Sequence, residues 1–165
     1  MLKNKVVLLF TALLAFSFSS SAMAVTKMKI QSVIGSSTSE VVMLKEFAAH
    51  VAIVTDGRVL MEIVPGGSVV PNNDVLDAVD AGLLDGGFAW THYWSGKHPA
   101  AMLFGSPVAG AGVGIDNIAW VSWFHSAGGK ELYDQLWDEM GMNIHGLMLQ
   151  PVGPEALGWF KEPIN

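Results

Sequence analysis

The chain has 165 residues, 51% of them hydrophobic, and its 15 acidic against 9 basic side chains give a formal net charge of −6. Such an acidic surface disfavours nucleic acids and anionic lipids as partners, because both carry dense negative charge. The sequence holds no cysteine, so disulfides, thiol catalysis and zinc–thiolate sites are excluded.

The first 24 residues have the pattern of a secretory signal peptide. Lys3 and Lys5 precede an apolar run over 6–16, which is followed by serines and by an Ala-Met-Ala sequence that ends at Ala24. The run is about half as long as the roughly 20 apolar residues that a membrane span needs. We therefore expect residues 1–24 to be removed on export to the periplasm, and residues 25–165 to form one domain.

The remaining sequence alternates between strand and helix patterns. The expected strands are 27–34, 59–64, 85–90 and 142–149, and the expected helices lie between Ser37 and Asp56 and over 71–82, 117–125 and 130–140. Ser37 and Glu40 have the spacing of a capping box at the start of the first helix. The order of elements predicts an α/β fold with a mostly parallel sheet flanked by helices.

The loops that follow parallel strands meet at one edge of the sheet, where open α/β folds bind their ligands. Three loops are expected at this edge, namely 35–37, 90–93 and 150–151. The pattern therefore predicts a binding edge, although every α/β domain has one.

Five stretches of the sequence are informative when they are taken together in chain order: the opening strand with its Ser/Thr-rich loop, 65–71, 77–88, 90–94 and 158–165. Together they resemble the DctP-type periplasmic solute receptors of tripartite ATP-independent (TRAP) transporters. The segments 90–94 and 158–165 are similar to the branch that binds 2-oxo acids such as pyruvate, or lactate. The resemblance implies a periplasmic-binding-protein-like fold, of which residues 25–165 would be the amino-terminal lobe only, with the second lobe missing.

The resemblance also implies a function in transport rather than an enzyme. A small monocarboxylate would be captured by hinge closure, beside a sodium or calcium ion, and passed to the TRAP membrane permease subunits. The arginine that clamps the carboxylate in this family would lie beyond Asn165, so we expect this chain alone to bind weakly or not at all. A homodimer is expected only for a full-length protein.

Four side chains are the candidate ligand contacts. The Tyr93 hydroxyl at a strand end can donate to a carboxylate, and the branch that the chain resembles uses a tyrosine there. The Gln150 side chain offers an oxygen to a hard cation and an amide to a substrate oxygen. Trp90 and His92 flank Tyr93 and are either pocket walls or packing residues.

The sequence leaves two other functions open. One is a secreted metal-binding protein or enzyme that uses histidines, and the candidates are His92, His98, His125 and His145. Their spacing lacks the i, i+4 pairing of two ligands on one helix face, and no G-x-S-x-G elbow is present. Asp85 is a formal candidate for a general acid but is more simply a solvated side chain. The other alternative is a non-functional, truncated receptor.

Overall fold

The computed structural model describes residues 24–104, 117–147 and 161–162. In this part of the chain, three strands form one sheet in the order β2-β1-β3: β1 (Thr26–Ser32) lies between β2 (Val59–Val64) and β3 (Gly86–Phe88). Both pairings are parallel, and Ile30 of β1 lies opposite Ile63 of β2 and Gly86 of β3. The predicted α/β class with a parallel sheet is therefore confirmed.

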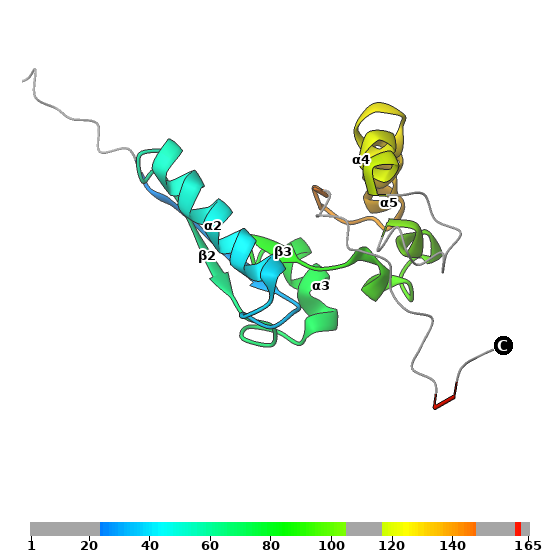
Figure 1. Cartoon of the computed structure of the whole chain (residues 1–165), viewed down its shortest axis with the longest axis horizontal. Coiled ribbons are helices and arrows are strands. Elements are labelled where there is room, and N and C mark those ends of the chain that lie inside the picture. Colours follow the sequence, from blue (N-terminus) through cyan, green and yellow to red (C-terminus); the bar gives the residue numbers. More distant parts are fainter. Residues whose placement is uncertain (1–23, 105–116, 148–160, 163–165) are drawn as a thin grey trace, which may run out of the picture.

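Helix α2 (Ser39–Val54) packs along β2 on one face of the sheet (Figure 1). Alternate strand residues point to opposite faces. In β2 this separates the partly buried Val59, Met61 and Ile63 from the exposed Leu60 and Glu62. The helix ends at Val54, as the sequence predicted from the turn that follows it.

On the opposite face of the sheet, described residues pack against the carboxyl ends of the strands. There the 3-10 turn η1 (Asn72–Asp74) leads into helix α3 (Val75–Asp80), and Val75 is fully buried. A Cβ at Gly87 of β3 would collide with Val75, so a glycine is required for α3 to lie this close to the strand. The helix predicted over 71–82 is thus present as a turn followed by a short helix.

The rest of the described chain forms a second, helical part. It comprises η2 (Thr91–Trp94), η3 (Pro99–Phe104), α4 (Asn117–Ser126) and α5 (Gly129–Glu139), and α4 and α5 lie away from the sheet (Figure 1). One apolar core nevertheless joins the two parts, from Val33 and Val75 to Leu136 and Trp137.

Two local predictions need correction. Thr38 occupies the N-cap position of α2 without a side-chain capping hydrogen bond, and Ser39 rather than Ser37 hydrogen-bonds Glu40, at 3.1 Å, so the predicted capping box is absent. The strand predicted over 142–149 is wrong for residues 142–147, which have no regular secondary structure.

The physical reason for the false strand lies in the packing of residues 142–147. Met142 and Ile144 are partly buried against the core, while Asn143 donates its main-chain N–H to the Asp80 carboxylate at 2.7 Å. The apolar residues alternate with polar ones because they pack on the helical part, and not because the segment is hydrogen-bonded to a neighbouring strand. Among the described helices, none has the length and apolar character needed to cross a membrane.

Candidate functional site

At the carboxyl edge of the sheet, a buried glutamine of β1 hydrogen-bonds the loop that follows β2. Gln31 has no exposed surface, and its Nε2 donates to the Val70 carbonyl at 2.7 Å. Its Oε1 accepts from the N–H groups of Val69 and Val70 at 2.9 and 3.1 Å. Asn72 adds a bond from Nδ2 to the Val33 carbonyl at 2.9 Å.

The third strand leads directly into the predicted site. Val33 N–H donates to the Phe88 carbonyl at 3.0 Å, so the ends of β1 and β3 are also joined. Trp90 then caps the turn η2, which carries His92 and Tyr93. Two of the three predicted loops, 35–37 and 90–93, therefore follow neighbouring parallel strands, and the third, 150–151, lies outside the described residues.

Trp90, His92 and Tyr93 form one aromatic cluster. The rings of Trp90 and His92 are stacked, with centroids 6.3 Å apart and an interplanar angle of 25°. The Tyr93 ring meets His92 edge-on at 5.1 Å and Trp90 at 5.9 Å. The structure thus brings three of the four predicted site residues together, and Gln150 falls in a segment that is not described.

Tyr93 is the most exposed member of the cluster, with 37% of its surface accessible. Among the described residues no hydrogen bond to its hydroxyl is found, so this group is available as a donor. His92 is half-buried, and its Nδ1 is a buried atom without a hydrogen-bond partner. An unpaired buried nitrogen is costly, and a bound polar group would reduce that cost.

Two side-chain hydrogen bonds hold the turn that carries the cluster. Trp94 at its end donates Nε1–H to the Asn73 carbonyl at 2.9 Å. Thr91 at its start shares a buried 2.9 Å hydrogen bond with the Tyr133 hydroxyl of α5. Burial raises the pKa of Tyr133, and the bond to Thr91 opposes part of that shift.

The basic side chains near this edge are largely engaged elsewhere. Lys97 pairs with Asp77 at 2.7 Å, and His98 Nε2 lies 3.3 Å from the Glu139 carboxylate. Lys45 of α2 approaches the 35–37 loop, where its Nζ lies 3.5 Å from the Ser36 carbonyl. The described edge therefore offers aromatic surface and one free phenol donor, while Lys97 and His98 are engaged with acidic side chains.

Arg58 lies at the end of the sheet opposite to the edge that carries Tyr93. It immediately precedes β2, and its Nε donates to the Thr55 carbonyl at 2.8 Å. It therefore cannot serve as a carboxylate clamp for the edge that carries Tyr93.

The histidines do not form a metal centre in the part of the chain that is described, where no group of three or more His, Cys, Asp or Glu side chains could hold an ion. His98 has both ring nitrogens engaged, because its Nδ1 accepts from Ala100 N–H at 3.2 Å and its Nε2 faces Glu139. His125 instead packs edge-on against Phe124 at 5.2 Å.

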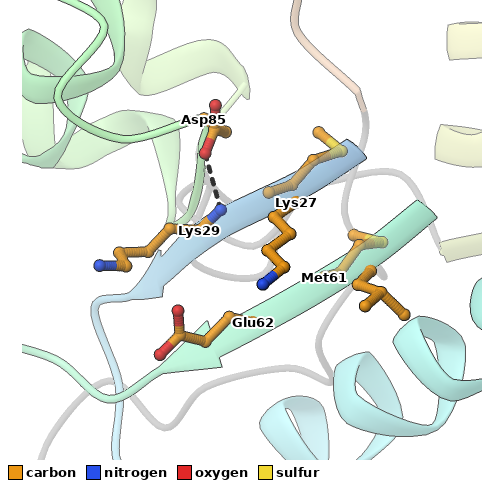
Figure 2. A pocket seen from close by; sticks show the side chains of 7 residues that line it. Lys27, Lys29, Met61, Glu62 and Asp85 are labelled. Carbon is orange, nitrogen blue, oxygen red and sulfur yellow. Dashed lines mark hydrogen bonds between the residues drawn. The ribbon is translucent and has the colours of Figure 1, made fainter. Parts of the chain in front are cut away.

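An open cavity of about 490 Å³ lies on the sheet face away from the predicted site (Figure 2). Its lining combines the charged side chains of Lys27, Lys29, Glu62 and Asp85 with the apolar Met28, Leu60 and Met61. Asp85 borders it and accepts the Lys29 main-chain N–H at 2.8 Å, so it is a structural acceptor rather than a simply solvated acid. None of the residues that line the cavity belongs to the Trp90–His92–Tyr93 cluster.

Sequence reasoning missed the residues that support the edge, chiefly Gln31, Asn72 and Tyr133. A local signal existed for Gln31, since an amide inside a buried strand needs partners. No local signal marks Tyr133, whose partner Thr91 is 42 residues away.

The described residues form an α/β module with a parallel sheet and an aromatic cluster at the carboxyl edge of that sheet. Residues 30–165 match DctP, the family described as bacterial extracellular solute-binding protein, family 7. The chain belongs to this family, which consists of transport receptors and not of enzymes.

Among curated proteins, the chain is 30% identical over 118 residues to the monocarboxylate 2-oxoacid-binding periplasmic protein of Nostoc sp., a match that covers 72% of this chain and 31% of the relative. Among solved structures, it is similar to a TRAP periplasmic solute-binding protein from Rhodobacter sphaeroides in an apo, open state. That match has 31% identity and a TM-score of 0.62, and it covers 70% of this chain and 36% of the other.

A TRAP solute-binding protein from Pseudoalteromonas atlantica, with bound sodium and pyruvate, has the same fold. It is 24% identical with a TM-score of 0.63, over 71% of this chain and 35% of the other. The chain thus spans about a third of the length of the relatives that it matches.

Proposed function

We propose that this chain is the ligand-facing, amino-terminal part of a TRAP solute receptor that takes a small monocarboxylate, with a 2-oxo acid such as pyruvate, or lactate, as the expected ligand. The observation that carries the proposal is the Trp90–His92–Tyr93 cluster at the carboxyl end of β3, in a chain of the DctP family. The name of the Nostoc relative supports the 2-oxo acid class.

In this proposal the free Tyr93 hydroxyl donates to a ligand carboxylate, and the rings of Trp90 and His92 form a wall beside it. Charge-assisted hydrogen bonds of this kind are among the stronger polar contacts. Gln150 would contact a cation next to the ligand. Sodium or calcium is the expected ion, and the sodium held with pyruvate in the Pseudoalteromonas protein supports including one.

The cellular setting follows from the same proposal. Residues 1–24 would direct export and be cleaved, so that the receptor acts in the periplasm. Its partners would be the organic acid and the TRAP membrane permease subunits. Closure over the ligand would require a second lobe like the one in the relatives, which are about three times as long as the part that matches.

The decisive experiment is a nuclear magnetic resonance titration of the chain with pyruvate or lactate, in sodium or calcium. It detects binding in the millimolar range, which corresponds to about −4 kcal/mol. We expect ligand-dependent shifts at His92 and Tyr93, and a Tyr93→Phe variant whose dissociation constant rises about tenfold, because hydrogen bonds to charged groups contribute roughly 1.5–3 kcal/mol.

A matched control is Lys27→Gln, which removes one charge from the cavity at the far end of the sheet and should leave the affinity unchanged. Absence of shifts with every acid and cation would contradict the proposal and favour a non-functional remnant. Metal that copurifies with the chain and is lost in a His92→Ala, His98→Ala double variant would favour the histidine-dependent alternative.

A further inference from the structure

We propose that Tyr133 is a positioning residue for the ligand edge, because its hydroxyl fixes the turn that presents His92 and Tyr93. The contacts of Tyr133 come from the structure, whereas the role of the turn in ligand binding rests on the proposed function. Tyr133 lies on α5, outside the loops in which ligand contacts were expected, and touches none of the three clustered rings in the pairs described.

The first support is the way in which η2 is anchored. The turn is only four residues long, and Tyr93 N–H donates to the Trp90 carbonyl within it at 3.1 Å. Its side-chain anchors stand at its two ends, at Thr91 and Trp94. His92 and Tyr93, the residues between these anchors, have ring contacts with each other and with Trp90, so their placement depends on the ends of the turn.

The second support is the rigidity of the group that forms the first anchor. The Tyr133 ring is enclosed by Phe104, Phe124 and Trp137, with centroid distances of 4.9, 5.6 and 5.1 Å. Such packing fixes the ring, so that the hydroxyl is held in place before Thr91 meets it. Thr91 is only 4% exposed, which keeps water from replacing the bond.

The third support is that the same ring also determines the path of the chain beyond α5. A Cβ at Gly146 would collide with Tyr133 and Trp137, so the main chain passes directly against both rings. Gly146 stands four residues before Gln150 in the sequence. Tyr133 therefore contacts both Thr91, the first residue of η2, and Gly146, in the segment that follows α5.

A purely structural hydrogen bond would give the same distances, so the test must separate stability from positioning. In the double variant Tyr133→Phe, Thr91→Val, both polar partners are replaced by apolar groups of similar shape, which is nearly neutral for stability. We expect its midpoint of unfolding to stay close to that of the wild-type chain. The turn, however, has lost its first anchor.

The readout that needs no ligand is amide hydrogen exchange at Tyr93 and Ser95, whose N–H groups bond within the turn. In the double variant we expect both to exchange at least tenfold faster, while the β1 amides are unchanged. The single variant Thr91→Ser keeps a hydroxyl opposite Tyr133 and should therefore exchange at the wild-type rate. Gln135→Ala on the exposed side of α5 is the matched control and should change neither rate.

Ligand titration then separates the two proposals. If the wild-type chain binds pyruvate and the double variant binds it about tenfold more weakly at equal stability, the positioning role is supported. Unchanged exchange at Tyr93 and Ser95 overturns it, whatever the ligand result. Faster exchange in a chain that binds no acid supports the positioning role and refutes the proposed function. Should the double variant fail to fold, Tyr133→Phe alone is tested by the same exchange measurement.

Discussion

The Gln31 side chain offers the most direct test of which hydrogen bonds hold the loops at the carboxyl edge of the sheet. It is fully buried and makes three hydrogen bonds to the loop after β2, of 2.7, 2.9 and 3.1 Å. Gln31→Leu keeps the size of the side chain and removes all three bonds. It leaves two amides and one carbonyl of Val69 and Val70 without partners.

The expected cost follows from these three bonds. At about 1 kcal/mol of net stabilisation each, their loss lowers the free energy of unfolding by about 3 kcal/mol. Each kcal/mol shifts the melting temperature of a domain of this size by roughly 3 °C, so we expect a decrease of about 10 °C. Such a loss is a large part of the roughly 5–15 kcal/mol that stabilises a typical domain.

The assay is urea unfolding followed by tryptophan fluorescence, with thermal unfolding followed by circular dichroism. Gln135→Leu is the matched control, because Gln135 is exposed and makes one side-chain bond to Glu139 at 2.7 Å. Its expected effect is within about 0.5 kcal/mol. A Gln31→Leu variant that loses less than about 1 kcal/mol would refute the argument that these bonds hold the edge loops together.

Three further predictions concern the helical part. Gly146→Ala should lower stability by about 1–3 kcal/mol in urea unfolding, since its Cβ meets Tyr133, whereas Gly96→Ala meets no atom and should be nearly neutral. Burial raises the pKa of Tyr133 above 10, so the stabilising contribution of its neutral phenol is complete below pH 10 and is lost as the pH rises through the raised value. Above pH 10 the free energy of unfolding of the wild-type chain should therefore fall more steeply with pH than that of Tyr133→Phe, and equal slopes would contradict this. Because Lys97 and Asp77 are both well exposed, Lys97→Ala should cost less than about 1 kcal/mol, and less still in high salt.

The strands and helices of the sheet region could be predicted because their signals are local. Asp56 and Gly57 both have a positive φ, of 52° and 71°, and the sequence pair at these positions marked the end of α2. The parallel order followed from the alternation of elements, and it placed Trp90, His92 and Tyr93 after β3. This is why three of the predicted site residues lie together at the carboxyl end of β3.

The remaining features depend on contacts between distant residues. Thr91 and Tyr133 are 42 positions apart, and neither has a spacing that indicates its partner. The alternation of Met142, Asn143 and Ile144 resembles a strand but arises from packing on the helical part. The capping prediction failed because the N-cap residue of α2 is Thr38, whose hydroxyl hydrogen-bonds the Gly35 carbonyl at 3.0 Å, while Ser39 bonds Glu40 instead.

The short strand β3 has a consequence for how molecules of this chain meet one another. Just before it, Asp85 donates its N–H to the Lys29 carbonyl at 3.0 Å, and its carboxylate accepts the N–H of the same residue at 2.8 Å. Both main-chain groups of Lys29 are thereby occupied at the point where the ladder stops. Together with the charges of Lys27 and Glu62 nearby, this discourages a strand from another molecule from adding there, and so limits aggregation.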